Sequence, residues 1–472
     1  MKISIQNLGI IKKAEIEVKP FTIFIGHNNS GKTWTAYALS TIIGAYAMEH
    51  YAKACLSDNF FQEYPPLTDT LEKLEEQGTA TIDMPEFVSQ YKDIYIKNIA
   101  SFAQDGLKEF MGTKKADFEN LNIHADFQHD KKEFSEYIKS FLFEENLVMG
   151  QEKKPLLNAL KEKGESILYF YSTAKGSISE EIPLRAVKEF LILSVFKLLH
   201  KTLNNSDYPY MYVFPTERTN YVSFSLNALE YLQSYEKEIH ISQKVDNQKP
   251  ESSASFDRML MNAFKTGSKT KRQEEIKDNP IIETYISLAD ILEKEVLGGG
   301  VDFSTPEPEP WRELIFQANQ NVQLDMPVVS SMVKELSPLV LYLRYLAKPN
   351  EMLIIDEPEM NLHPKAQVQL TEFLAMLVNF GLNILITTHS PYLVDHAANL
   401  IKASKKKNKK SIQDIFYLKN QNAFIPVDKV SVYLFEKGTA NNILNKNGEI
   451  NWETFSRISD EITDLYFDMD KV

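Results

Sequence analysis

With 472 residues, the chain exceeds what one hydrophobic core usually holds, so we expect a main domain with an inserted or appended part. Its net charge of −13 argues against a surface that wraps nucleic acid. The sequence has no apolar run of the roughly eighteen residues that a membrane span needs. A single cysteine, Cys55, excludes an intramolecular disulfide and a cysteine-based zinc site. We expect a cytoplasmic protein without membrane contact.

The N-terminal part predicts a sheet that the chain enters directly. Residues 2–7 and 13–18 are typical of short strands, and residues 21–25 form an apolar, β-rich run. A helix is expected over residues 34–48. A strand at the very start is unlike a signal peptide. We therefore expect residues 1–48 to form the N-terminal lobe of the main domain.

The segment between the third strand and this helix matches the pattern G-x-x-x-x-G-K-[ST], which holds nucleotide phosphates. Two glycines allow a tight turn that points successive N–H groups at phosphate oxygens. The lysine would reach the β- and γ-phosphates, and the Thr33 hydroxyl would ligate Mg²⁺. The predicted nucleotide-binding residues of this loop are Gly26, His27, Asn28, Asn29, Ser30, Gly31, Lys32 and Thr33.

Residues 49–205 differ from what precedes them. They are helical in pattern, aromatic and charge-mixed, without turn-punctuated strands or sustained heptads, and residues 188–203 are their most apolar helix. The missing heptads argue against a long coiled-coil arm. We expect a compact helical insertion.

The main domain is expected to resume over residues 206–430. Residues 210–214 are typical of a strand, and in the turn that follows we expect Arg218 to pair with Glu217 or another acid rather than to contact nucleotide or a partner. A helical insertion over about 225–297 includes a polar segment, residues 243–275, which we expect to be mobile. After three glycines, short antiparallel strands are expected. They lie at residues 301–303, 313–316 and 322–324.

Ionisable side chains follow two of the expected buried strands. A buried strand ends in Asp356, which would hold the magnesium shell, and Glu357, which would polarise the attacking water. About thirty residues later, strand 383–388 ends in His389, at the sheet edge where parallel α/β proteins place ligands. We expect His389 to sense the γ-phosphate; the alternative is a histidine satisfied within the core.

Together these motifs resemble the ABC-type ATPases, in the branch that includes SMC proteins, DNA-repair ATPases and the OLD-like ATPases of bacterial defence. The resemblance implies an α/β fold, with a P-loop NTPase head of the ABC type, a mixed β-sheet and a flanking helical insertion. It implies ATP and Mg²⁺ as cofactors, with Glu357 and His389 as catalytic residues. Residues 361–364 stand where the D-loop of that family follows the catalytic glutamate.

The same family carries a signature motif, a Ser-Gly turn that opens a helix and contacts the ATP of a second subunit. The best candidate is residues 328–336, in which Ser331 would reach that ATP and either Ser330 or Ser331 would cap the helix. Met332 stands where relatives carry glycine, and its side chain would crowd a phosphate. The alternative is that the serines only cap a core helix. A homo-oligomer, a dimer of heads or higher, is expected.

Two charged segments each allow two interpretations. The basic run at residues 402–410 is either a solvated loop or a contact for DNA phosphates. Residues 460–470 alternate acids with apolar residues, as a helix that docks a partner does, although an ordinary solvated helix has the same pattern. Residues 431–472 are therefore assigned to a C-terminal tail.

The resemblance also predicts a division of labour between polypeptides. OLD-family nucleases carry a C-terminal Toprim domain, whereas the one Asp-x-Asp here, Asp468 to Asp470, ends the chain. We therefore expect a slow ATPase that controls a separately encoded effector, a nuclease, as in two-gene anti-phage systems of the Septu or PARIS type. A phage-derived trigger would act on it. The alternatives are an ATP-stabilised scaffold with little turnover and a DNA-repair-type ATPase.

Overall fold

The computed structural model describes most of the chain. Its described residues are 1–57, 62–127, 131–149, 154–173, 178, 182–205, 211–223, 251–266, 269–304, 313–319, 322–450, 464, 466 and 469. The chain forms two compact units, each discontinuous in sequence. Unit 1 comprises Met1–Ser4, Tyr37–Phe110 and Ala116–Met211, and unit 2 comprises Ile5–Ala36, Met111–Lys115 and Tyr212–Val472.

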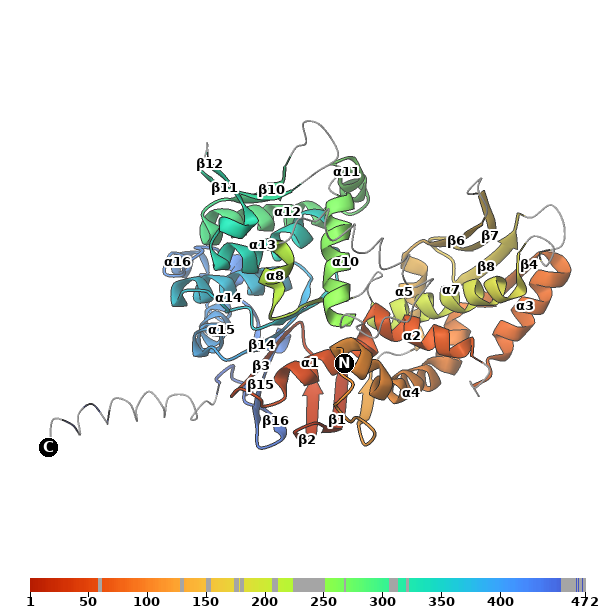
Figure 1. The fold of residues 1–472 in the computed structure, drawn as a ribbon, viewed down its shortest axis with the longest axis horizontal. Coiled ribbons are helices and arrows are strands. Elements are labelled where there is room, and N and C mark those ends of the chain that lie inside the picture. The colour runs from red at the N-terminus through yellow and green to blue at the C-terminus, as the bar shows by residue number, and fades with distance from the viewer. Residues whose placement is uncertain are drawn as a thin grey trace. The chain divides into compact units, whose positions relative to one another are not determined.

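The large sheet is mixed, with the strand order β5-β1-β2-β16-β15-β3-β14-β13-β9 (Figure 1). Its centre is parallel: β3 (Phe21–Gly26) lies between β15 (Val430–Glu436) and β14 (Asn383–Thr388), and β14 pairs with β13 (Met352–Asp356). All residues of β3 and β13 are buried, as expected of parallel strands covered on both faces. β16 (Thr439–Asn442) runs antiparallel to β15. The predicted α/β fold with a mixed sheet is confirmed.

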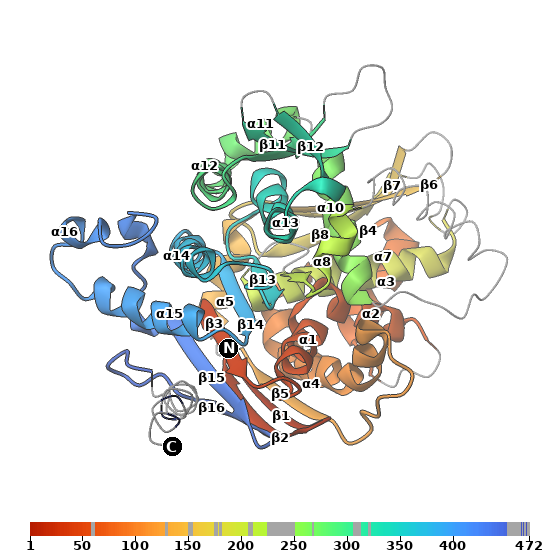
Figure 2. The ribbon, with the colours of Figure 1, turned by 60° about the vertical axis from the view of Figure 1, so that its left-hand side comes forward.

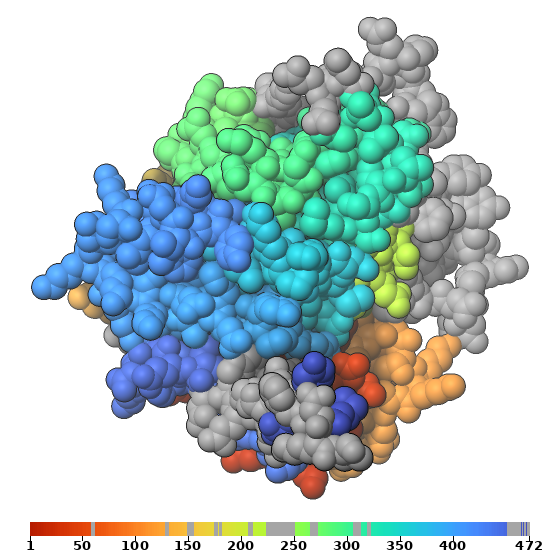
Figure 3. Space-filling model, turned by 90° about the vertical axis from the view of Figure 1, so that its left-hand side faces the viewer, coloured from red at the N-terminus to blue at the C-terminus, as the bar shows by residue number. Residues whose placement is uncertain are grey.

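Helices of unit 2 pack around these strands (Figure 2). Helices α14 (Pro364–Asn379) and α15 (Pro391–Ser404) pack against each other, and α12 (Ile281–Leu292) packs against α13 (Ser331–Tyr345). In the space-filling view, the blue region of α14–α16 and the green to cyan region of α11–α13 form one continuous surface (Figure 3). β1 (Lys2–Leu8) and α1 (Lys32–Ile43) are each divided between the two units. The other strands and helices of unit 2 are β2 (Ile11–Glu17), β9 (Met211–Phe214), α8 (Arg218–Ser223), α10 (Glu251–Thr266), α11 (Lys269–Asp278), a π-helix (Glu293–Leu297) and α16 (Lys410–Gln413).

A small antiparallel sheet precedes α13, as the sequence predicts. Strands β10 (Gly300–Phe303), β11 (Leu314–Asn319) and β12 (Val322–Asp325) pair in order, with Val301 opposite Phe316. Both of these side chains are buried in the core of unit 2. Each apolar side chain buried in this way contributes about 1.5–3 kcal/mol to folding.

The segment expected to be mobile, residues 243–275, contains a packed helix instead. Residues 243–250 lie outside the described part, but α10 begins at Glu251 and buries Phe256, Met259 and Leu260 in the core of unit 2. The spacing of these three residues is that of one helix face. The serines and lysines around them lower the average hydropathy of the segment and mask this spacing.

Unit 1 corrects the expectation of an insertion without strands. A four-stranded antiparallel sheet has the order β4-β8-β7-β6, and a further strand, β5 (Asn122–Asp126), lies at the edge of the large sheet. β4 (Thr79–Asp83) and β5 are only five residues long and alternate exposed with buried side chains, so neither forms an apolar run. The other elements of unit 1 are α2 (Ala45–Cys55), α3 (Pro65–Gln77), α4 (Met84–Met111), α5 (Lys131–Ser140), β6 (Phe143–Met149), β7 (Lys154–Lys161), β8 (Ile167–Ser172) and α7 (Leu184–Asn204).

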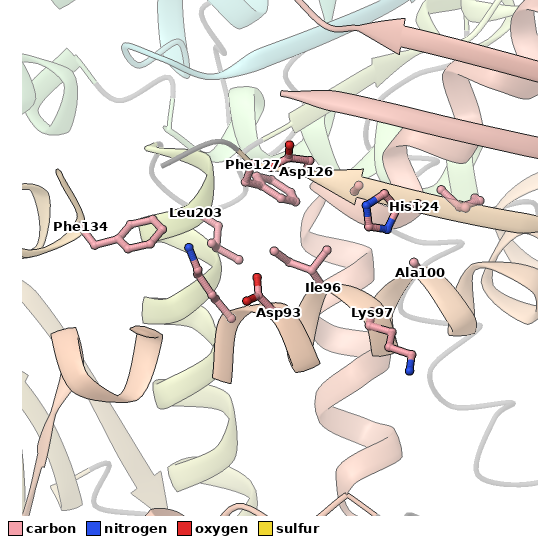
Figure 4. A pocket seen from close by; sticks show the side chains of 12 residues that line it. Asp93, Ile96, Lys97, Ala100, His124, Asp126, Phe127, Phe134 and Leu203 are labelled. Atoms are coloured by element: carbon pink, nitrogen blue, oxygen red, sulfur yellow. The ribbon is translucent and has the colours of Figure 1, made fainter. Parts of the chain in front are cut away.

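A pocket of about 350 Å³ lies within unit 1, between α4, β5, α5 and α7 (Figure 4). Ile96, Phe127 and Leu203 supply apolar lining, and the ammonium of Lys92 lies 4.9 Å from the centre of the Phe134 ring. No residue of the predicted nucleotide motifs belongs to this unit. The pocket therefore contains none of the predicted nucleotide-binding residues.

Two further expectations concern membranes and the tail. Within the described ranges, no helix has the length and apolar character to cross a membrane. The predicted C-terminal tail, residues 431–472, includes most of β15 and all of β16, which are strands of the large sheet and not tail. The predicted docking segment at residues 460–470 lies outside the continuously described part of the chain.

Candidate nucleotide site

The loop after β3 depends on its two glycines. Gly26 has φ +155° and Gly31 has φ +94°, and a Cβ at Gly26 would lie 2.4 Å from the carbonyl oxygen of Phe435. At Gly31, the added carbon would lie 2.6 Å from the Ile11 side chain. Only glycine therefore fits these two positions. The loop leads into α1, which begins at Lys32.

Lys32, at the end of this loop, is buried, with 4% of its surface exposed. Its ammonium donates hydrogen bonds to the carbonyl oxygens of Gly26 at 3.0 Å and His27 at 2.9 Å. Burial lowers the pKa of Lys32 to about 8, and the nearby acidic residues, Glu357 foremost, oppose that shift. The ammonium lies 3.5 Å from His389 Nδ1. Lys32 thus joins the loop to the ends of β13 and β14.

Asp356, at the end of β13, accepts hydrogen bonds from three threonine hydroxyl groups. Thr33 donates to Oδ1 at 2.9 Å, Thr216 donates to Oδ2 at 2.6 Å, and Thr387 also donates to Oδ1. The predicted pair Thr33 and Asp356 is thus brought together. Thr216 is a contact that sequence reasoning missed, because it lies 140 residues before its partner.

The chemistry of this pair fits Mg²⁺. A hydroxyl and a carboxylate oxygen are the hard ligands that Mg²⁺ prefers, and Mg²⁺ is commonly held by one or two protein groups together with substrate phosphates. Within the described ranges, no group of three or more His, Cys, Asp or Glu side chains forms a protein-only metal site.

Glu357 and His389 meet at the same sheet edge. His389 Nε2 lies 3.0 Å from Glu357 Oε1, and this hydrogen bond is the main cause that lowers the pKa of Glu357, against the effect of burial. Both side chains remain partly exposed. An ionised carboxylate beside an imidazole can accept a proton from, or orient, a water molecule.

Glu359 is a second site residue that sequence reasoning missed. Its Oε1 accepts hydrogen bonds from the backbone N–H of His389 at 2.7 Å and from the Thr388 hydroxyl at 2.6 Å. Burial raises the pKa of this carboxyl. Glu359 therefore fixes the backbone at the end of β14. The available signal was its position two residues after Glu357.

Arg218 is the first residue of α8, which follows the turn after β9, and has 1% of its surface exposed. Its Nη1 donates to the carbonyl oxygens of Pro215 at 3.0 Å and Asp356 at 2.8 Å, and Nη2 donates to that of Glu357 at 3.2 Å. Its acidic partner is Glu335 of α13, 2.8 Å from Nε, rather than the adjacent Glu217.

The predicted signature helix is capped by Ser330 and not by Ser331. Ser330 Oγ accepts from Val333 N at 3.4 Å, and Ser331 is the first, exposed residue of α13. Met332 is partly buried and packs against the core of unit 2. Its side chain therefore contributes to packing. The predicted contact of Ser331 with a second subunit stays a prediction.

Comparisons with known proteins give one local sequence match and a distant likeness to solved structures. Over 63 residues the chain is 41% identical to the Old nuclease of Escherichia phage P2, a match that spans 13% of this chain and 11% of that protein. Two solved SMC heads, one bound to the C-winged helix domain of ScpA and one from Pyrococcus furiosus bound to the C-terminal domain of ScpA, align over 94% and 98% of this chain and 96% and 98% of theirs. Their identities are 11% and 12% and their TM-scores 0.39 and 0.37.

A family model described as AAA ATPase domain matches residues 1–394. This match covers far more than half of the 472 residues and contains β3 with its loop, β13 and β14. The chain belongs to the AAA ATPase domain family.

Proposed function

We propose that the chain binds Mg²⁺-ATP at the carboxyl ends of β3, β13 and β14 and hydrolyses it. Family membership implies ATP binding. The observation that carries hydrolysis is the convergence of Lys32, His389 and Glu357, in which the imidazole lies 3.5 Å from the ammonium and 3.0 Å from the carboxylate. Positioning and electrostatic stabilisation are what phosphoryl transfer to water requires.

Each residue has a distinct role in this proposal. The N–H groups of residues 26–33 and the start of α1 hold phosphate oxygens, and Lys32 turns from the loop carbonyls to the β- and γ-phosphates. Thr33 and Asp356 would hold Mg²⁺, which neutralises charge on the phosphate oxygens. Glu357, ionised at neutral pH, orients and deprotonates the attacking water. His389 contacts the γ-phosphate and stabilises this carboxylate.

Phosphate release by the purified chain tests the proposal. We expect turnover that requires Mg²⁺ and falls at least about 100-fold in Asp356→Asn, because that change weakens the metal position and its three hydroxyl contacts. Turnover in EDTA, or full turnover in Asp356→Asn, would contradict it.

We further propose that hydrolysis regulates a separately encoded effector, a nuclease, in anti-phage defence. The motifs that resemble OLD-like ATPases and the local match to the phage P2 Old nuclease support this role. Affinity purification from cells at native expression, with mass identification of bound proteins, tests it. We expect one nuclease to bind in an ATP-dependent manner. A Lys32→Ala chain that retains the same partner would argue against nucleotide control, and a complex without a nuclease would argue against the proposed effector.

A dimer of heads is proposed as the active assembly. Support comes from exposed apolar residues close in sequence to the site motifs: Val328 before α13, Met360 after Glu357, and Tyr392 after His389. Exposed apolar side chains are typical of interaction surfaces where they form one contiguous patch, which is what we propose for these three residues. Light scattering with ATP and with ADP, on the parent chain and on Ser331→Arg, tests the assembly.

We expect an ATP-dependent increase in mass that Ser331→Arg abolishes and that a control at an exposed serine of α16, Ser411→Arg, leaves intact. A mass that depends on neither nucleotide nor Ser331 would favour the second candidate, an ATP-stabilised scaffold with little turnover.

A further inference from the structure

One buried ion pair joins three segments of unit 2 that are far apart in sequence. The side chains of Arg218 and Glu335 are each 1% exposed, and Arg218 Nε lies 2.8 Å from Glu335 Oε2. The second carboxylate oxygen, Oε1, accepts a hydrogen bond from Asn361 Nδ2 at 3.0 Å. Glu335 lies in the second turn of α13, and Asn361 lies in the loop between β13 and α14. A single carboxylate therefore contacts the turn after β9 and the loop after Glu357.

The other donors of Arg218 hold the backbone of the acidic pair. Nη1 and Nη2 donate to the carbonyl oxygens of Asp356 and Glu357 at 2.8 and 3.2 Å. Because the guanidinium is planar and its donors have a fixed geometry, a change in its orientation must move these contacts together. A lysine has one ammonium on a flexible stem and could not hold both carbonyls and the carboxylate in this way.

The backbone that Arg218 holds is in an unfavourable conformation. Glu357 has φ +48°, in the left-handed region that residues other than glycine rarely adopt, and Asn361 has φ +60°. Such a conformation persists only where the surroundings constrain it. At Glu357 the constraints are the hydrogen bond from its N–H to the Thr387 carbonyl oxygen at 3.0 Å and the contact of its own carbonyl with Arg218.

We propose that Arg218 and Glu335 are positioning residues that set the backbone of Glu357 and couple it to the N-terminal turns of α13 and to Asn361. This inference rests on the proposed role of Glu357 in ATP hydrolysis. A change at the start of α13 would pass through Glu335 to Arg218 and then to the carbonyl of Glu357. The orientation of the Glu357 carboxylate, which acts on the attacking water, would follow that change.

Two variants test the contacts of Glu335 with Arg218 and with Asn361 one at a time. Glu335→Gln removes the charge that pairs with Arg218 and keeps the shape of the side chain. Asn361→Gly removes the side chain whose amide bonds Glu335, and glycine accepts φ +60° without strain. Glu293→Gln is the matched control, because it breaks a partly buried pair with Arg344 at the C-terminal end of α13.

The measurements are kcat, the ATP Kd and amide hydrogen exchange of residues 357–362 in the nucleotide-free chain. We expect both variants to lower kcat about 10–100-fold, as small misplacements of catalytic groups do, with the ATP Kd nearly unchanged. We expect faster exchange over residues 357–362. The double variant should be no slower than the worse single variant, because both changes act through one network.

The control should lower the thermal midpoint without changing kcat or this exchange. If Glu335→Gln and Asn361→Gly behave like the control, the proposal is wrong and the pair only stabilises the fold. If the parent chain releases no phosphate, the proposed hydrolysis fails, while hydrogen exchange still decides whether the network positions Glu357.

Discussion

Two histidines, one in each unit, show how the same residue type takes different roles. His200 in unit 1 is 1% exposed, with Nδ1 2.8 Å from the Tyr95 hydroxyl and Nε2 2.7 Å from the Ile43 carbonyl oxygen. Burial lowers its pKa to about 4, so its ring is neutral at pH 7. His389 in unit 2 lies instead between an ammonium and a carboxylate. Neutral, fully buried partners indicate a structural histidine, whereas charged, partly exposed neighbours indicate chemistry.

Two lysines repeat the contrast. Burial lowers the pKa of both Lys32 and Lys161 to about 8. In unit 1, Lys161 donates to the carbonyl oxygens of Ile138, Phe141 and Glu162 near the C-terminal end of α5. Such contacts satisfy orphan carbonyls of a helix end. In unit 2, Lys32 lies near three carboxylates at the end of a parallel strand. A shifted pKa alone therefore does not distinguish function from structure; the neighbours do.

The largest expected effect separates these two lysines. Lys32→Met should reduce the affinity for ATP at least about 100-fold, because charge-assisted hydrogen bonds to phosphate are lost. Lys161→Met should lower the thermal midpoint and leave the affinity for ATP unchanged. Calorimetric titration and thermal denaturation of both variants test this. If both variants lose the same affinity for ATP, Lys32 has no special role in nucleotide binding.

Substitutions of His389 and His200 should differ in their effects on ATP and ADP affinity. His389→Asn should have an affinity for ATP or a turnover about tenfold lower than the parent. Its affinity for ADP should stay close to that of the parent, because only ATP offers a γ-phosphate. His200→Asn should leave both affinities unchanged and reduce stability by about 1–3 kcal/mol, because a buried polar partner is left unsatisfied. Parallel losses of ATP and ADP affinity in His389→Asn would favour a structural histidine.

The lowered pKa of Lys32 predicts that ATP binding is accompanied by proton uptake. In the nucleotide-free chain, Lys32 is mostly charged at pH 7 and mostly neutral at pH 9, because its pKa is about 8. Phosphate restores the charge, so ATP binding should take up most of a proton at pH 9 and almost none at pH 7. Titrations in buffers of different ionisation enthalpy measure this uptake. Lys161→Met should retain it; proton release at pH 9 would contradict the assignment.

The smallest expected effect concerns the cap of α13. Ser330→Ala should lower the free energy of unfolding by about 1 kcal/mol, because the Val333 N–H loses its acceptor. The neighbouring change Ser331→Ala should have almost no effect. Urea denaturation compares the two. A larger loss at Ser331 would mean that the helix begins elsewhere.

The sequence predicted the parallel centre of the large sheet because β3, β13 and β14 are short apolar runs followed by diagnostic side chains. It did not predict β4 and β5, since five alternating residues give a weak signal between helices. The same limit applies to α10, whose buried face is interrupted by polar residues.

Within the site, the sequence predicted the residues whose motifs are local, such as Thr33 and Asp356. It did not identify Thr216 or the choice of Glu335 as the partner of Arg218. Those contacts join residues more than one hundred positions apart. Only the packing of β9, β13 and α13 brings them together.

The nucleotide retained by Glu357→Gln tests the central claim most directly. The variant keeps the loop, Lys32 and Asp356 but loses the carboxylate that acts on water, so it should bind ATP and hydrolyse it at least about 100-fold more slowly. After incubation with Mg²⁺-ATP and rapid removal of free nucleotide, we predict that the variant retains ATP and the parent retains ADP or none. ADP on the variant, formed at the rate of the parent, would contradict the assignment of Glu357 and of this sheet edge as the hydrolytic site.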